Sequence, residues 1–136
     1  MTRIRVVLAE DHPEMAQHLR ALIDTYYEVD VVADGQALIA AVNVEMPDII
    51  ITDIAMPGMS GLIAARSIRA AHPAARFIFV SVRDEPSVIR KALSEGALGY
   101  VIKSDAGDEL MKAVQTVLAG GRYVSSSARA ALKDGP

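Results

Sequence analysis

The chain has 136 residues and a mass of 14.5 kDa, which suits one domain, because single cores usually serve about 100 to 200 residues. Its 51% hydrophobic residues and mean hydropathy of +0.26 exclude a disordered chain, and the absence of cysteine excludes disulfides and thiol or zinc–thiolate chemistry and favours a cytoplasmic location. The net charge of -3 and pI near 5.5 lack the basic footprint of a nucleic-acid-binding module, so we expect no direct contact with DNA or RNA.

Five short apolar runs predict the strands of a parallel sheet. They span residues 4–9, 28–32, 48–52, 76–81 and 98–102. Three of them are apolar on both faces, which is typical of strands covered by helices on both sides. The first run is short and ends at an acidic pair, so we expect neither a signal peptide nor a membrane span, and no contact with membranes.

Helix-period stretches separate these runs and complete five βα units. The first begins at Pro13, three others span residues 36–45, 61–73 and 86–96, and the fifth ends at Gly120 and Gly121. We therefore expect an α/β domain with helices on both faces of the sheet, occupying residues 1–121. Residues 122–136 follow as a C-terminal tail, either a short helix with serine caps or a linker.

Polar side chains stand where the predicted strands end. Glu10 and Asp11 follow the first strand, Asp53 the third, Ser81 ends the fourth and Lys103 follows the fifth. The carboxyl ends of parallel strands share one edge, so these side chains should meet there. Three adjacent carboxylates repel one another, by about 4 kcal/mol for a pair about 4 Å apart at an effective dielectric near 20. A divalent cation together with the ammonium of Lys103 would balance their charge, and oxygen ligands favour Mg²⁺ or Mn²⁺.

With such a cation in place, one carboxylate can attack phosphorus, as in enzymes with aspartyl-phosphate intermediates. Asp53 is the best candidate, because the open loop IAMPGMSG follows it. Lys103 and Ser81 would then contact the phosphoryl oxygens. A phosphatase of the haloacid-dehalogenase kind needs a second aspartate two residues later, where this chain has Ala55, and a flavin phosphate would be repelled by the acidic first loop.

The segments VVLAEDHP, DIIITDIAMPGMSG, FVSV and GALGYVIKSD together resemble response-regulator receiver domains of two-component signalling, over residues 3 to 121. The resemblance implies a three-layer (βα)5 flavodoxin-like fold whose five-stranded parallel sheet has the order 2-1-3-4-5. It implies that Asp53 accepts a phosphoryl group from a sensor histidine kinase. It also implies that Mg²⁺ is held by Glu10, Asp11, Asp53 and the main-chain carbonyl of Ala55.

The same resemblance makes Ser81 and Tyr100 a switch pair. In such receivers the hydroxyl turns toward the phosphoryl group and the aromatic ring rotates inward, which remodels the face of the fourth helix, fifth strand and fifth helix. The alternative for Tyr100 is an aromatic residue of an edge strand that merely packs. One departure is Val82, where the family usually has a smaller residue beside the hydroxyl, so access for phosphodonors is narrower.

The segments AEDHP, MPGMSG and AGGRYVSSSARA most resemble the NarL/LuxR-type receivers, which precede a helix-turn-helix domain. The expected function is thus that of a signalling domain rather than a turnover enzyme, controlling a DNA-binding output that this chain lacks. A phosphorylation-dependent homodimer is a further expectation. The alternatives are a stand-alone receiver or an interaction scaffold that works without phosphorylation.

Overall fold

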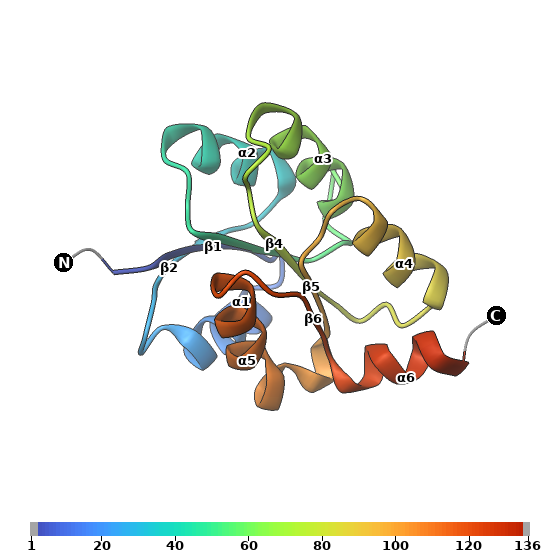
Figure 1. The fold of residues 1–136 in the computed structure, drawn as a ribbon. Helices are drawn as coiled ribbons and strands as arrows, with labels where there is room; N and C mark the ends of the chain where they lie inside the picture. The colour runs from blue at the N-terminus through green and yellow to red at the C-terminus, as the bar shows by residue number, and fades with distance from the viewer. Residues whose placement is uncertain (1–2, 135–136) are drawn as a thin grey trace.

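The computed structural model describes residues 3–134, which fold around a parallel β-sheet (Figure 1). The strands are β1 (Arg5–Ala9), β2 (Glu28–Val32), β3 (Ile49–Thr52), β4 (Phe77–Ser81), β5 (Gly99–Ile102) and β6 (Tyr123–Val124). Their order is β2-β1-β3-β4-β5-β6, and every neighbouring pair is parallel. All strand carboxyl ends therefore lie at one edge of the sheet.

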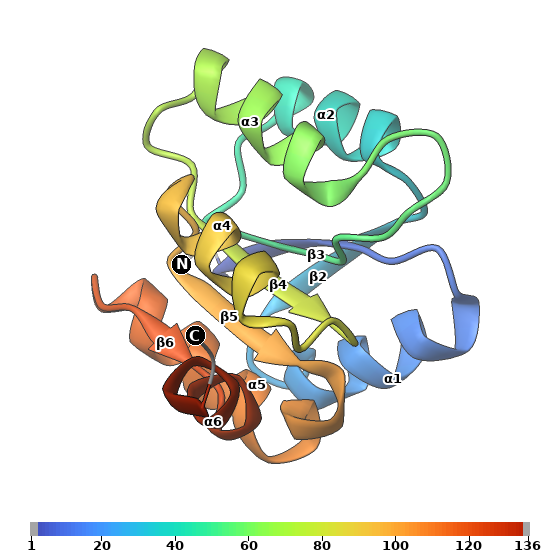
Figure 2. The same ribbon diagram turned by 90° about the vertical axis from the view of Figure 1, so that its right-hand side faces the viewer.

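Helices cover both faces of this sheet, so the molecule has three layers (Figures 1 and 2). The helices are α1 (Pro13–Ile23), α2 (Gly35–Val44), α3 (Gly61–Ala71), α4 (Pro86–Ser94), α5 (Ala106–Leu118) and α6 (Ser126–Asp134), with a 3-10 turn, η1, at Lys103–Asp105. On one face lie α2, α3 and α4, and on the other α1 and α5. Within residues 3–134, no helix combines the length and apolar character needed to cross a bilayer.

Successive residues of the central strands point into two different cores. Val7 and Ile50 pack in the core under α2, α3 and α4, whereas Val6 and Ile49 pack in the core under α1 and α5. This alternation explains why the central strands read as continuous apolar runs, because both of their faces are buried. The prediction of an α/β fold with a helix-covered parallel sheet is confirmed, and the predicted elements lie within two residues of the observed ones.

The expected number of strands was wrong, because the sheet has six strands instead of five. The sixth, β6, pairs with the outer edge of β5, with Tyr123 opposite Gly99 and Val124 opposite Tyr100. Two residues are too short a run to show any periodicity in the sequence. The order of the first five strands is the expected one.

The tail that follows β6 forms the helix α6, which packs against α4 and β5. Ser125 connects β6 to α6, and its carbonyl accepts the N–H of Arg129 at 2.8 Å. Residues 1–2 of the predicted domain and 135–136 of the predicted tail lie outside the described residues.

Candidate functional site

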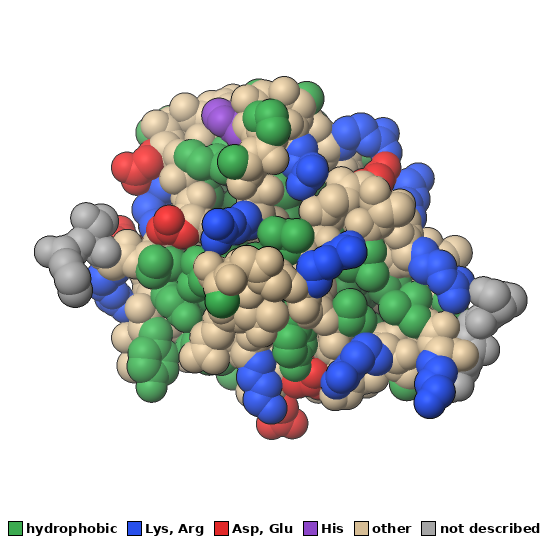
Figure 3. Space-filling model, in the orientation of Figure 1, with side chains coloured by type: hydrophobic (Ala, Val, Ile, Leu, Met, Phe, Trp, Pro, Cys, Tyr) green, Lys and Arg blue, Asp and Glu red, His purple; other side chains and the backbone are tan. Residues whose placement is uncertain are grey.

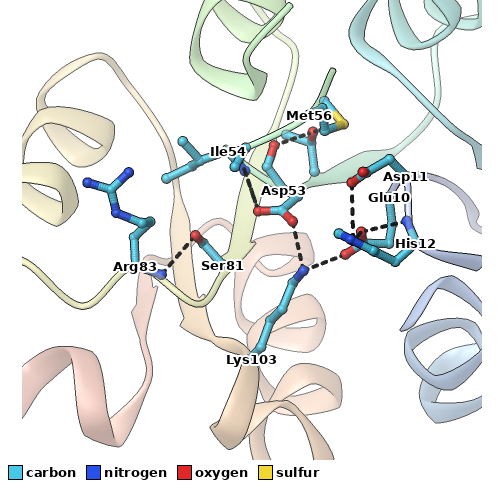
Figure 4. A network of polar contacts seen from close by, with 11 residues as sticks. Glu10, Asp11, His12, Asp53, Ile54, Met56, Ser81, Arg83 and Lys103 are labelled. Carbon is cyan, nitrogen blue, oxygen red and sulfur yellow. Dashed lines mark hydrogen bonds and ion pairs between the residues drawn. The ribbon is translucent and has the colours of Figure 1, made fainter. Parts of the chain in front are cut away.

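Asp53 lies directly after β3, at the carboxyl edge of the sheet, and is only 6% exposed (Figure 4). Its Oδ1 accepts the N–H groups of Ile54 at 2.7 Å and Ala55 at 3.3 Å. Its Oδ2 faces the ammonium of Lys103 at 2.7 Å. The loop thus fixes one oxygen of the carboxylate and directs the other toward a cation.

The start of α3 lies against the main chain of Asp53. The N–H of Gly61 donates to the carbonyl of Ile54 at 2.7 Å, and a Cβ atom added to Gly61 would stand 1.9 Å from the carbonyl oxygen of Asp53. The side chain of Ser60 caps the helix by accepting the N–H of Ile63 at 3.2 Å. Glycine is therefore required where the loop after Asp53 turns into α3.

Lys103 bridges two acids that come from different strands. Its Nζ lies 2.7 Å from Oε1 of Glu10 and 2.7 Å from Oδ2 of Asp53, and its side chain is only 9% exposed. Burial raises the pKa of Glu10, but hydrogen bonds from Lys103 and His12 outweigh this and hold the pKa below its ordinary value. Burial lowers the pKa of Lys103, but hydrogen bonds with Asp53 and Glu10 hold it above its ordinary value.

Glu10, Asp11 and His12 form a cluster after β1 whose ligand atoms all lie within 4.8 Å of one another. Oε2 of Glu10 accepts the N–H of His12 at 3.1 Å, and Nδ1 of His12 lies 3.2 Å from the same oxygen. Nδ1 of His12 also lies 3.4 Å from Oδ1 of Asp11, a buried oxygen that accepts no hydrogen bond from residues 3–134. A buried carboxylate oxygen that accepts no hydrogen bond, beside the carboxylate of Glu10, fits a hard divalent cation such as Mg²⁺.

Ser81 and Tyr100 lie on adjacent strands next to this site. Ser81 is fully buried, and its Oγ accepts the N–H of Arg83 at 3.0 Å. Tyr100 is also fully buried, and its hydroxyl donates to the carbonyl of Arg83 at 2.8 Å. Burial raises the pKa of Tyr100 to about 12, against a hydrogen bond with Ser81 that lowers it. The phenol is therefore a neutral donor at any ordinary pH.

The structure brings Lys103 into direct contact with both Asp53 and Glu10 (Figure 4). Asp11 lies beside Glu10, and Ser81 ends the strand next to β3. The exposed Ala55 reaches Asp53 through its N–H, and the role predicted for its carbonyl stays a prediction. Tyr100 does not lie on an edge strand, since β6 covers the outer side of β5.

The contact between His12 and Glu10 was not among those expected from the sequence. The position of the histidine two residues after the acid, in a loop, was the available signal. Ser125, whose Oγ accepts the N–H of Ile102 at 3.1 Å directly before Lys103, was also not expected.

Comparison with known proteins agrees with this geometry. The family model for the response regulator receiver domain matches residues 6–115. The transcriptional regulatory protein MctR of Rhizobium johnstonii is 34% identical over 129 residues, covering 91% of this chain and 59% of that protein. A probable transcriptional regulatory protein NarL of Mycobacterium tuberculosis is 31% identical over 128 residues, covering 92% of this chain and 59% of that protein. The chain thus spans about three fifths of the length of these relatives.

Solved structures show the same relationship. A LuxR-family two-component response regulator from an Aurantimonas species superposes with a TM-score of 0.92 and 32% identity, covering 98% of this chain and 97% of that one. The isolated REC domain of RcsB from Salmonella enterica serovar Typhimurium, in the presence of phosphomimetic BeF3-, superposes with a TM-score of 0.86 and 26% identity, covering 96% and 99%. The chain belongs to the response regulator receiver domain family, and within it to the NarL/LuxR subfamily.

Proposed function

We propose that Asp53 is the phosphoacceptor of this receiver domain and that the donor is a phosphohistidine of a sensor histidine kinase in the cytoplasm. A carboxylate oxygen of Asp53 attacks phosphorus, the P–N bond to the histidine breaks, and the imidazole nitrogen leaves with that electron pair and takes up a proton from water. The product is an acyl phosphate on Asp53. The observation that carries this proposal is the 2.7 Å contact between Asp53 Oδ2 and Lys103, which puts a fixed cation beside the attacking group.

Three acids would hold a divalent cation, Mg²⁺ or Mn²⁺, at this site: Glu10, Asp11 and Asp53, together with the carbonyl of Ala55. The cation would supply neutralisation of the charge on the transferring group. Oδ1 of Asp11 is the residue atom best placed to bind it, since it is buried and has no hydrogen bond of its own among the described residues. The loop N–H groups on Oδ1 of Asp53 keep that carboxylate oriented during transfer.

Lys103, Ser81 and Tyr100 would respond to the phosphoryl group by changing their contacts. Lys103 would move its ammonium from the carboxylates to the new phosphoryl oxygens, and the Ser81 hydroxyl would turn from the Arg83 N–H to donate to one of them. Tyr100, whose hydroxyl holds the same Arg83, would follow this change and alter the face of α4, β5 and α5. The domain thereby acts as a switch that takes up and loses one phosphoryl group, not as a turnover enzyme.

The output of the switch would be control of transcription by a DNA-binding domain outside residues 1–136. The relatives MctR and NarL are named as transcriptional regulatory proteins, and this chain covers only 59% of each. The tail of residues 122–136 would lead toward that domain. Phosphorylation would also promote a homodimer of the chain, which sedimentation with and without beryllofluoride can test.

The deciding experiment is phosphorylation of the 136-residue chain by acetyl phosphate with Mg²⁺, read by mass spectrometry. We expect uptake of one acid-labile phosphoryl group, no uptake by Asp53→Asn, and normal uptake by the control Asp108→Asn, an exposed acid on α5. Uptake by Asp53→Asn equal to that of the wild type would remove Asp53 from its role. No uptake by the wild type would leave the phosphorylation-independent scaffold as the better account.

A further inference from the structure

The segment of residues 122–134 is hydrogen-bonded to β5, the strand that carries Tyr100 of the switch pair. The N–H of Ser125 donates to the carbonyl of Tyr100 at 2.9 Å, and the N–H of Ile102 donates to Oγ of Ser125 at 3.1 Å. Ser125 is fully buried. The two hydrogen bonds of Ser125 therefore fix the main chain of β5 on both sides of Val101, just before Lys103.

Two carboxylates from the segment that follows β5 accept hydrogen bonds from the first turn of α6 and from Tyr123 before it. Glu109 accepts the Tyr123 hydroxyl at 2.7 Å and the N–H of Ser126 at 3.0 Å. Asp105 accepts the N–H of Ser127 at 2.9 Å and its hydroxyl at 2.8 Å. These bonds satisfy N–H groups that have no partner inside a helix. Asp105 ends η1, which starts at Lys103, and Glu109 lies in the first turn of α5.

The apolar side of α6 completes the core that contains Tyr100. Ala128 is fully buried and belongs to the same cluster as Tyr100 and Ile89 of α4, with Leu132 packed against it. Hydrophobic side chains lie between the regions of α4 and α6 in Figure 3, with Lys and Arg side chains around them. In Figure 2, α6 lies beside β6, and it packs against α4 and β5. The docked helix thus encloses the aromatic ring from the side that β5 would otherwise expose.

We propose that residues 122–134 are a working part of the switch: their docking on β5 and phosphorylation of Asp53 stabilise each other. This inference rests on the proposed function and adds a regulator to it. The docked segment fixes the backbone of β5 at Tyr100 and Ile102 and closes the space beside the Tyr100 ring. It therefore favours the inward ring, whose hydroxyl holds the Arg83 loop next to Ser81.

Coupling of this kind is reciprocal. Docking of residues 122–134 and the phosphoryl group both favour the inward position of the Tyr100 ring. Each therefore increases the equilibrium constant of the other by the same factor. Phosphorylation of Asp53 would then be transmitted to any domain joined after residue 136 as tighter docking of α6 on β5. Release of α6 would in turn weaken the phosphorylated state.

A matched pair of substitutions on α6 tests the proposal in the full chain. Ala128→Asp places a charge in the buried cluster and should detach the helix, while Ala130→Asp places the same charge on its exposed side. The probe is beryllofluoride with Mg²⁺, titrated and followed by the thermal midpoint. We expect Ala128→Asp to bind it roughly five-fold or more weakly, and Ala130→Asp to bind it as the wild type does. Equal affinity of Ala128→Asp and wild type would overturn the proposal.

The reverse direction is read by hydrogen exchange. In the wild type, beryllofluoride with Mg²⁺ should slow exchange of the amides in residues 122–134, and in Ala128→Asp this protection should be absent. Unchanged or faster exchange of these amides in the wild type would contradict mutual stabilisation.

A second pair serves where Ala128→Asp does not fold. Glu109→Gln removes the charge that holds Ser126 and Tyr123, and Asp108→Asn removes the charge of its exposed neighbour. We expect weaker beryllofluoride binding only in Glu109→Gln, and equal binding by the two variants would overturn the proposal. A wild type that binds no beryllofluoride would instead refute the proposed function, and the inference with it. A wild type that binds it normally, with no effect of either pair, would refute the inference alone.

Discussion

The ammonium of Lys103 lies 2.7 Å from Oδ2 of Asp53, although the two residues are 50 positions apart in the chain. The same ammonium lies 2.7 Å from Oε1 of Glu10, so one cation pairs with two carboxylates. The repulsion expected among the acids at the sheet edge is therefore partly relieved by the protein itself.

Replacing Lys103 with methionine should destabilise the chain in the absence of metal, on the order of 3 kcal/mol, because two buried carboxylates lose their only shared counter-charge within residues 3–134. Mg²⁺ should restore part of this loss by taking the place of the ammonium. Urea unfolding with and without Mg²⁺ measures both effects. Lys112→Met, at an exposed position on α5, is the control, and equal stability of the two variants would contradict the bridging role.

Gly61→Ala should both destabilise the chain and slow phosphorylation of Asp53. The added Cβ would stand 1.9 Å from the Asp53 carbonyl oxygen, so the start of α3 and the loop must move, at a cost of about 1–3 kcal/mol. Gly107→Ala is the control, since nothing lies within 4 Å of its added Cβ, and it should stabilise α5 by about 0.4–1 kcal/mol. Thermal unfolding and phosphorylation rates would compare them, and a harmless Gly61→Ala would show that the contact is not tight.

Acid should loosen α6 before it unfolds the sheet. Burial raises the pKa of Glu109, but hydrogen bonds from Tyr123 and Ser126 outweigh this and hold it below its ordinary value of 4.5. Burial likewise raises the pKa of Asp105, and hydrogen bonds from Ser125 and Ser127 hold it below 3.8. Groups with a lowered pKa stabilise the fold above their ordinary pKa and lose this contribution as the pH falls through the folded value.

The measurement for this prediction is the free energy of unfolding of the wild type and Glu109→Gln as a function of pH. The advantage of the wild type should be constant near neutral pH, begin to shrink near pH 4.5 and vanish below the folded pKa of Glu109. Hydrogen exchange in residues 122–134 should rise over the same range. A difference between the two proteins that does not depend on pH would show that Glu109 acts by packing alone.

Tyr100→Phe should cost about 1 kcal/mol, since the ring stays buried and only the hydrogen bond to the Arg83 carbonyl is lost. The amides of residues 82–85 should exchange faster, because the hydroxyl no longer holds that loop. Tyr26→Phe, on a side chain that is 69% exposed, should change neither property. Faster exchange that spreads evenly over the whole molecule would point to general destabilisation instead of a local tether.

The sequence was sufficient to predict the rim of the site, because parallel strands bring their carboxyl ends to one edge whatever their spacing in the chain. Asp53, Lys103 and Glu10 could be placed together on that ground alone. The contacts of Ser81 and Tyr100 with Arg83 were not predictable, since they depend on the path of an irregular loop.

The tail was the least predictable part. A short helix with serine caps was one of the two forms expected for it, the other being a linker. The carboxylates that cap the observed helix, Asp105 and Glu109, lie 22 and 17 residues before their partners. In the sequence Glu109 looks like an ordinary acid in the first turn of a helix. Only the fold shows that it serves a different helix.

The pairing of β6 with β5 also covers an edge strand that could otherwise pair with another molecule of the protein. Without residues 123–125, the outer side of β5 would present the unpaired carbonyls of Leu98 and Tyr100 and the unpaired N–H of Ile102 as a template for a strand of another molecule. A shortened version ending at residue 121 would therefore be prone to edge-to-edge aggregation, and a shortened domain made for crystallisation or fusion should retain residues 123–125.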